Sequence, residues 1–180
     1  KGYFVSDDPV LNRVYQTRGI LSEEDIQYQL SGLLPYQSMK GLDAASQLLY
    51  SCYLAQKTVI VIGDYDVDGA TATTVMVAGL REMGLRQVGF IIPNRITDGY
   101  GLTPKLVDRA HEKGADLIIT VDNGIVSYAG VDRARELGMS VLVTDHHLAG
   151  DTLPDCVIVN PNQPGCKFES KAIAGVGVAF

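Results

Sequence analysis

Short runs of apolar, mostly β-branched residues recur along the last two thirds of the chain. These runs span residues 58–62, 88–92, 116–121, 140–144 and 157–159. Their length and their continuous apolar character are typical of strands that are buried on both faces. The segments between the first four runs predict helices over residues 70–83, 104–113 and 128–137. Alternation of this kind indicates right-handed βαβ units, and therefore an α/β fold with a parallel β-sheet and helices on both faces.

The first part of the chain has a different pattern, which predicts helices and a linker. Ser22 followed by Asp25 predicts a helix start with a capping box. A second helix is predicted over about residues 42–55. We therefore expect a helical N-terminal segment over residues 1–57 and an α/β domain over residues 58–180.

Composition narrows the class of protein. Of the 180 residues, 46% are hydrophobic and 20% charged, which is enough to form a folded core. No apolar run approaches the roughly 20 residues that cross a bilayer, and no targeting leader is visible, so we expect no membrane association. Cys52, Cys156 and Cys166 lack CxxC spacing, which favours a reduced, cytoplasmic location and argues against a disulfide framework or a thiolate zinc site.

The net charge of −6 counts against nucleic acid as a partner, because DNA-binding proteins usually carry a basic surface. That objection weakens where acidic residues cluster around divalent cations, since the ions reverse the local field. The position of the acidic residues is therefore more informative than their number.

Polar clusters follow each of the first four predicted strands. In chain order they contain Asp64, Asp66 and Asp68; Asn94 and Arg95; Asp122; and Asp145, His146 and His147. The carboxyl ends of parallel strands lie at one edge of a sheet, where ligands bind. We expect these four clusters to converge on one site.

The alternating carboxylates of Asp64, Asp66 and Asp68 repel one another unless cations neutralise them, which favours a metal site over a solvated acidic turn. A calcium EF-hand loop begins with the same D-x-D-x-D-G pattern, but its twelfth position needs glutamate and here is Val75. Asp122 stands in an Asp-Asn-Gly sequence that by itself is equally typical of a turn. Beside the acidic triplet, Asp122 becomes the natural bridge between two ions.

His146 and His147 offer imidazoles in two directions, one to ligate a metal and the other to hydrogen-bond a phosphate or leaving group. Carboxylates combined with one imidazole suit Mn²⁺ or Mg²⁺ better than zinc. The guanidinium of Arg95 matches phosphate oxygens, although pairing with local carboxylates is almost as common, and Asn94 adds a neutral donor. Two divalent ions about 3.5–4 Å apart activate a shared water for phosphoester hydrolysis. The residues alone thus predict a metal-dependent phosphoesterase.

Taken together, the motifs resemble the DHH phosphoesterase superfamily. The matching residues are Asp64-x-Asp66-x-Asp68-Gly69, Asn94-Arg95 with Gly99-Tyr100-Gly101, Asp122-Asn123-Gly124 and Asp145-His146-His147. Within that superfamily they are most similar to bacterial exonucleases that degrade single-stranded DNA from 5′ to 3′. The resemblance implies a DHH-type, Rossmann-like domain and phosphodiester hydrolysis in DNA repair and recombination. It also points to single-stranded DNA, a helicase and a single-strand-binding protein as partners.

The resemblance implies a ligand set for two metal ions. Asp64 and Asp66 match the ligands of one ion, and Asp68 and His146 match those of the other. Asp122 matches the carboxylate that bridges them and takes part in catalysis.

The resemblance also implies roles around the substrate. His147 would contact the scissile phosphate or assist the leaving group, and Asp145 would orient the histidine pair. Arg95 would hold a substrate phosphate, with Asn94 supporting its loop.

One departure from the family pattern limits the expected activity. The family's next metal-binding aspartate and its second domain would lie beyond Phe180, so we expect the α/β domain to be truncated at its C-terminal end. A fragment of this kind is expected to bind Mn²⁺ weakly and to show little or no nuclease activity.

Three alternatives remain. The same motifs serve pyrophosphatases and the phosphodiesterases of cyclic dinucleotides and oligoribonucleotides, and a DHH-like scaffold could have lost catalysis. A haloacid-dehalogenase-type phosphatase would use Asp66 as nucleophile and Asp68 as acid, but Ala70 stands where that family usually has Thr or Val. That third alternative also leaves the histidine pair without a role.

Overall fold

The computed structural model describes residues 5–27 and 29–180, and the chain divides into two compact units between Pro35 and Tyr36. In the first unit, helix α1 (Pro9–Thr17) begins at Asp8, whose carboxylate accepts the backbone N–H groups of Val10 and Leu11. Two short 3₁₀ helices follow, η1 (Glu23–Ile26) and η2 (Leu30–Gly32).

The predicted helix start at Ser22 is confirmed. Asp25 Oδ2 accepts the Ser22 N–H at 2.9 Å, which is the backward bond of a capping box. The helix that follows is only the four-residue 3₁₀ turn η1, because the chain leaves helical geometry at Gln27.

The second unit holds the predicted sheet. Its strands are β1 (Val59–Ile62), β2 (Val88–Ile91), β3 (Leu117–Val121), β4 (Ser140–Thr144) and β5 (Val157–Val159). The strands are all parallel and lie in the order β2-β1-β3-β4-β5. The helices of this unit are η3 (Tyr36–Ser38), α2 (Leu42–Leu54), α3 (Val67–Glu82), α4 (Pro104–Glu112), α5 (Tyr128–Glu136) and α6 (Gly175–Ala179). The predicted α/β fold is therefore confirmed.

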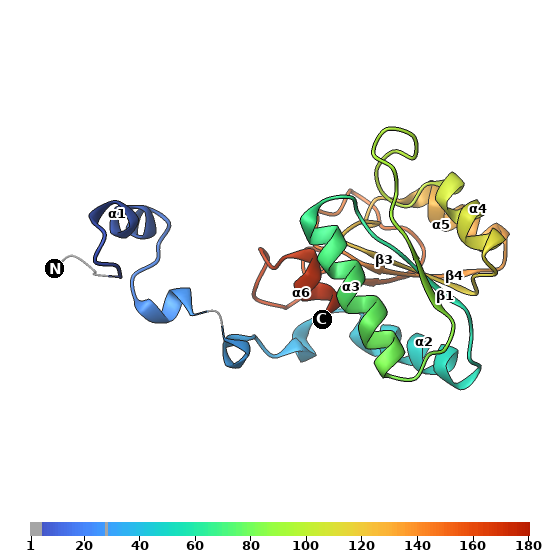
Figure 1. Cartoon of the computed structure of the whole chain (residues 1–180), viewed down its shortest axis with the longest axis horizontal. Coiled ribbons are helices and arrows are strands. Elements are labelled where there is room, and N and C mark those ends of the chain that lie inside the picture. The colour runs from blue at the N-terminus through green and yellow to red at the C-terminus, as the bar shows by residue number, and fades with distance from the viewer. Residues whose placement is uncertain (1–4, 28) are drawn as a thin grey trace. The chain divides into compact units, whose positions relative to one another are not determined.

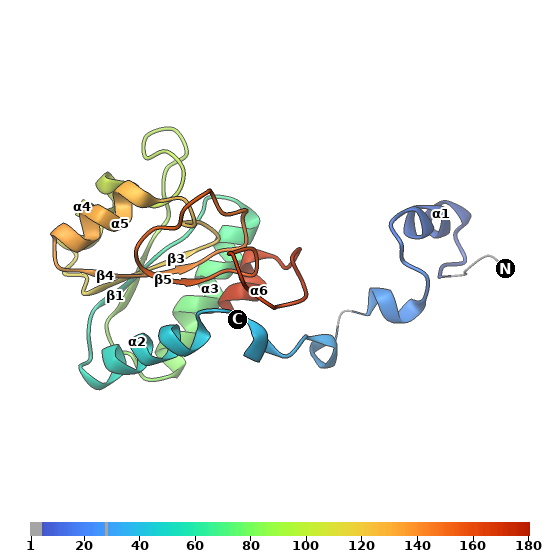
Figure 2. The same cartoon turned by 180° about the vertical axis from the view of Figure 1, so that it is seen from behind.

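Helices cover both faces of the sheet, as Figures 1 and 2 show: α2, α3 and α6 lie on one side, α4 and α5 on the other. Alternate residues of a strand point to opposite faces. In β1, Val59 and Val61 pack toward α3, whereas Ile60 and Ile62 pack toward α4 and α5. This two-sided burial explains why β1 is apolar without interruption.

Helix α2 packs with the sheet of its own unit. Its Ala45 and Cys52 are buried in the same apolar cluster as Val59. The helix predicted over residues 42–55 is thus confirmed, while a domain boundary at residue 57 stays a prediction.

The strand order creates a position suited to ligand binding. From β1 the chain crosses to β2 on one side, and from β3 it continues to β4 on the other. Where neighbouring connections run in opposite directions, the carboxyl ends of the two strands leave a crevice between them. The acidic loop of residues 64–68 follows β1, and Asp122 follows β3, so both lie at this switch point.

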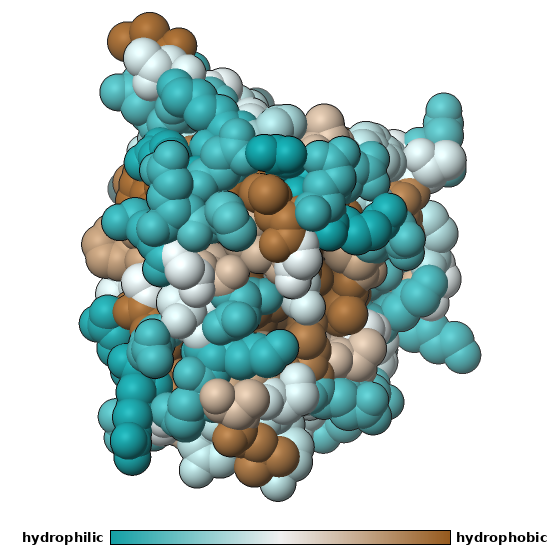
Figure 3. All heavy atoms as spheres, turned by 90° about the vertical axis from the view of Figure 1, so that its right-hand side faces the viewer, coloured by the Kyte–Doolittle hydropathy of each residue, from teal (hydrophilic) through white to brown (hydrophobic). Residues whose placement is uncertain are grey.

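Hydrophilic residues cover most of the face shown in Figure 3, with hydrophobic residues exposed in a band near its middle. Across residues 5–27 and 29–180, no helix has the length and apolar character needed to span a membrane.

Candidate metal centre and active site

The acidic loop after β1 is held by its own backbone contacts. Asp64 is buried, and its Oδ1 accepts the Tyr65 N–H at 2.8 Å. Asp66 is exposed and caps α3 by accepting the Gly69 N–H at 2.9 Å. Gly69 packs so closely on Asp64 that a Cβ there would lie 2.6 Å from the Asp64 backbone. The glycine of the D-x-D-x-D-G motif thus allows the helix to begin directly beneath the carboxylates.

Asp122 is the most unusual carboxylate of the site. It is 1% exposed and its φ of 61° lies in the left-handed region, which residues other than glycine rarely occupy. Its backbone N–H donates to Thr144 O at 3.0 Å, which holds it to the end of β4. Burial first, and then the charge of Asp68, raise the pKa of Asp122 to about 7, although His146 opposes this.

The side-chain oxygens of Asp122 fit a divalent cation. Asp122 Oδ1 is buried and accepts no hydrogen bond from a described residue, although His146 Nε2 lies only 3.0 Å away. Two ligands of one octahedral ion, each about 2.1 Å from it, are themselves about 3 Å apart. A buried carboxylate oxygen that lies 3.0 Å from an imidazole nitrogen therefore has the donor chemistry and spacing of a shared cation site.

Potential ligand atoms gather in two groups that share Asp122. Those of Asp64, Asp66 and Asp122 lie within 4.8 Å of one another, and so do those of Asp122, His146 and His147. A carboxylate common to both groups has the position that a bridge between two ions requires.

Asp68 belongs to neither group. Its Oδ2 accepts the Gly175 N–H at 2.7 Å, and its Oδ1 accepts the Val176 N–H at 2.8 Å. The same Oδ2 lies 3.6 Å from His146 Nε2. Asp68 is therefore next to the second group, with both oxygens already bound to the first turn of α6.

The histidine pair is held by Asp145, which is 1% exposed. Asp145 Oδ1 accepts the backbone N–H groups of His146 at 2.7 Å and His147 at 3.1 Å, and lies 2.7 Å from His147 Nδ1. Its Oδ2 accepts the Ile125 N–H at 2.9 Å. Burial by itself lowers the pKa of His147, but the hydrogen bond and charge of Asp145 outweigh it, so the pKa is raised.

Asn94 and Arg95 lie in the loop after β2 and belong to neither ligand group. Asn94 Oδ1 accepts the N–H groups of Ile96 and Thr97, so this side chain closes the loop. The Arg95 guanidinium lies 5.3 Å from the centre of the Tyr65 ring, a cation–π contact. Tyr65 separates Asp64 from Asp66, so this contact places Arg95 beside the acidic loop; within the described residues Arg95 makes no ion pair.

Sequence reasoning missed two asparagines around the histidines, and it quoted Tyr100 in a motif without giving it a role. Asn160 Nδ2 donates to His147 O at 3.0 Å, and Asn162 Nδ2 donates to His146 O. The Tyr100 hydroxyl lies 3.4 Å from both ring nitrogens of His147. The available signal for the two asparagines was their place directly after the fifth strand, where polar residues again follow an apolar run.

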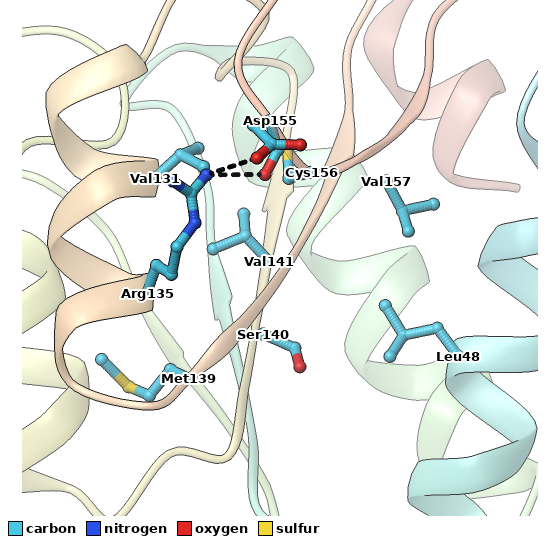
Figure 4. Close-up of a pocket in the computed structure, with 9 residues that line it drawn as sticks. All are labelled: Leu48, Val131, Arg135, Met139, Ser140, Val141, Asp155, Cys156 and Val157. Carbon is cyan, nitrogen blue, oxygen red and sulfur yellow. Dashed lines mark hydrogen bonds and ion pairs between the residues drawn. The ribbon is translucent and has the colours of Figure 1, made fainter.

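A separate cavity of about 230 Å³ lies near the amino ends of β4 and β5, away from the carboxylates (Figure 4). Its two charged groups pair with each other, since Arg135 Nη2 lies 3.1 Å from Asp155 Oδ2. Burial raises the pKa of Cys156, which also lines the cavity, to about 12, so its thiol stays protonated at neutral pH. This cavity lacks an activated nucleophile and a cluster of metal ligands.

Known proteins are similar to this chain in both sequence and fold. The chain is 50% identical over 173 residues to the single-stranded-DNA-specific exonuclease RecJ of Escherichia coli (strain K12), a match that covers 96% of the chain and 30% of that protein. It is 40% identical over 167 residues to the RecJ of Thermus thermophilus, covering 92% of the chain and 24% of that protein. The chain therefore spans about 30% of the length of the first of these relatives.

Two crystal structures show the same arrangement of elements. A structure of exonuclease RecJ bound to manganese matches 82% of the chain, with a TM-score of 0.73 and 38% identity over 37% of that protein. A structure of Thermus thermophilus RecJ in complex with Mn²⁺ matches 94% of the chain, with a TM-score of 0.70 and 36% identity over 23% of that protein. The sequence profile of the DHH family, N-terminal domain, matches residues 58–180, which include every strand of the sheet. The chain belongs to the DHH family.

Proposed function

We propose that this chain forms the metal-holding part of an exonuclease that hydrolyses the phosphodiester bonds of single-stranded DNA from the 5′ end. The observation that carries the proposal is the buried Asp122 carboxylate, which two groups of ligand atoms share and whose Oδ1 accepts no hydrogen bond from a described residue. The substrate is supported by the relatives, which are named as single-stranded-DNA-specific exonucleases. The 5′→3′ direction rests on the resemblance of the motifs.

Mn²⁺ or Mg²⁺ is the proposed cofactor, because the ligands are carboxylates with one imidazole and two RecJ structures contain manganese. Asp64, Asp66 and Asp122 would hold one ion; Asp122 and His146, with Asp68 beside them, would hold the other. When bound, such ions lower the pKa of a water molecule and neutralise charge on the reacting phosphate.

The histidine after the metal ligand is proposed as a proton donor. Asp145 Oδ1 lies 2.7 Å from His147 Nδ1 and accepts its hydrogen bond, which fixes the ring; the other ring nitrogen, Nε2, is not bound by Asp145. Because Asp145 raises the pKa of His147, the imidazolium form persists nearer to neutral pH and can donate from Nε2 to the phosphate or the leaving oxygen. The Asp145 carboxylate accepts hydrogen bonds from the histidines and from Ile125, so we assign it a positioning role.

Arg95 is proposed to hold a phosphate of the DNA strand. It has no ion-pair partner in the described part of the chain, and Tyr65 keeps its guanidinium beside the acidic loop. The proposed role of Asn94 is to support this loop through its bonds to Ile96 and Thr97. A cytoplasmic location, and a helicase and single-strand-binding protein as partners, follow from the same assignment to DNA repair and recombination.

The test uses the gene product that carries this chain, purified at its full encoded length. It is incubated with 5′-phosphorylated single-stranded or duplex DNA and Mn²⁺ or Mg²⁺, beside the variants Asp122→Ala and Asp132→Ala. We expect release of mononucleotides from the 5′ end of the single strand by the parent and by Asp132→Ala, whose carboxylate is exposed on α5, but not by Asp122→Ala.

Other outcomes distinguish the alternatives. Untouched DNA together with hydrolysis of pyrophosphate, cyclic dinucleotides or oligoribonucleotides would assign the protein to another DHH-type activity. Mn²⁺ binding without hydrolysis of any of these substrates would instead identify an inactive scaffold.

A further inference from the structure

The first turn of α6 lies against the carboxylates although it is distant in the sequence. The N–H groups of Gly175 and Val176 donate to the two oxygens of Asp68, 107 and 108 residues away. Helix α6 packs beside α3 on the same face of the sheet, as Figures 1 and 2 show. Asp68 thus ties the start of α3 to the start of α6.

Gly175 leaves no room for a side chain on the side that faces Asp122. A Cβ at this position would lie 2.5 Å from Asp122 Oδ1 and 2.7 Å from Asp122 Cβ and Cγ. The backbone of Gly175 is outside the left-handed region, so its conformation suits any residue and the need for glycine is steric.

Asp122 has little freedom to move away. It is buried, its backbone is left-handed, and its N–H is bonded to Thr144 O. A side chain at position 175 would therefore displace either the Asp122 carboxylate or the first turn of α6. Displacing α6 would pull its two N–H groups away from Asp68. Movement of Asp122 or of α6 therefore changes the distance between the carboxylates of Asp122 and Asp68.

We propose that Gly175 is a positioning residue of the divalent-cation centre. Its missing side chain lets α6 close directly over Asp122, and its N–H fixes Asp68 beside His146. The link to cation binding rests on the proposed function, whereas the steric coupling between Gly175 and Asp122 does not depend on it.

The chain offers two matched glycine controls. Gly177 lies in the same helix, but a Cβ there would meet the side-chain carbons Cγ1 and Cδ1 of Ile173, at 2.6 and 2.8 Å, and not Asp122. Gly79 lies in α3, where a Cβ would meet nothing within 4 Å. Both substitutions introduce the same methyl group without reaching Asp122.

The first experiment measures Mn²⁺ binding to this chain by calorimetry, with Gly175→Ala, Gly177→Ala and Gly79→Ala beside the parent. We expect Gly175→Ala to weaken the affinity at least about tenfold, the loss typical when a partner that orients a metal ligand is removed. Gly177→Ala and Gly79→Ala should bind like the parent. Equal affinity of the parent and Gly175→Ala would overturn the proposal.

The second experiment measures thermal unfolding in EDTA for Gly175→Ala, Asp122→Gly and the double variant. Asp122→Gly removes all three atoms that the new Cβ would strike, and glycine accepts the left-handed backbone at position 122. Gly175→Ala should lower the melting temperature more in the parent than in the Asp122→Gly background. If Gly175→Ala alone does not fold, that complete loss of the transition counts as the larger fall. Equal losses of melting temperature in both backgrounds would refute the steric coupling.

A parent that does not bind Mn²⁺ would refute the cation site of the proposed function. The unfolding comparison would still decide whether Gly175 and Asp122 are coupled.

Discussion

His147 Nδ1 lies 2.7 Å from Oδ1 of the buried carboxylate of Asp145. The same oxygen accepts the backbone N–H groups of His146 and His147, so a single atom fixes both the ring and the chain around it. Each group in this network that faces the Asp145 carboxylate, whether a backbone N–H or the His147 ring, donates a hydrogen bond to it. A carboxylate, which only accepts, is therefore the side chain that the position requires.

Replacing Asp145 with asparagine should destabilise the chain. The amide keeps one accepting oxygen but turns an NH₂ group toward a donor, so at least one buried hydrogen bond is lost. We expect the free energy of unfolding in urea to fall by about 1–3 kcal/mol. The exposed Asp151 provides the control, since Asp151→Asn should change this free energy by less than about 0.5 kcal/mol. Equal stability of the two variants would contradict the structural role of Asp145.

Asn160 supports the histidine pair from the other side. Its Nδ2 donates to His147 O at 3.0 Å, and its Oδ1 accepts the Asn162 N–H at 2.7 Å, with Asn160 itself fully buried. Asn160→Ala leaves both partners without their bonds, so we expect a loss of about 1–3 kcal/mol in the free energy of unfolding. Asn160→Asp keeps the accepting oxygen but not the donor and adds a buried charge, so it should not restore stability. Restoration by Asn160→Asp would show that only the bond to Asn162 matters.

Asp98 gives the fold a measurable dependence on acid. Lys105, at 2.8 Å, the Asn94 N–H and Arg109 hold the pKa of this carboxyl to about 2. Because the folded pKa lies below the unfolded one, the stability it contributes is present above about pH 4 and is lost as the pH falls toward about 2. The difference in urea midpoint between the parent and Asp98→Asn should therefore narrow from about pH 7 to about pH 2.5. A difference in urea midpoint that does not change with pH would show that the charge of Asp98 does not contribute to stability.

The sheet and most of the site were predictable because both depend on local patterns. Continuous apolar runs indicate buried parallel strands, and residues that follow such strands meet at one edge. This reasoning placed Asp64, Asp66, Asp122 and the histidines near one another without any knowledge of distant contacts. The helix predicted from residue 70 begins at Val67 instead. Its first turn contains Gly69, a residue that usually weakens a helix but is required here by the close approach of Asp64.

The remaining features depend on contacts between distant segments. That Asp68 ligates a metal ion stays a prediction; what the sequence did not indicate is that its two oxygens also accept two N–H groups of α6. No spacing rule connects Asp68 with Gly175, because only the packing of α6 on α3 brings them together. Arg95 was expected to face phosphate, and the cation–π contact with Tyr65 depends on how two loops approach each other.

Divalent cations should stabilise the chain through Asp122. A ligand that binds only the folded state adds about 2.7 kcal/mol at a concentration 100 times its dissociation constant. We therefore expect Mn²⁺ to raise the unfolding midpoint of the parent, and EDTA to reverse the effect.

Asp122→Asn should abolish this response to Mn²⁺, because the amide carries no charge to offset the ion. The metal-free variant should be at least as stable as the metal-free parent, since the substitution removes a buried carboxylate whose pKa is raised to about 7. Asp132→Asn, on the surface of α5, should retain the full response to Mn²⁺. An undiminished Mn²⁺ response in Asp122→Asn would place the cation elsewhere in the molecule.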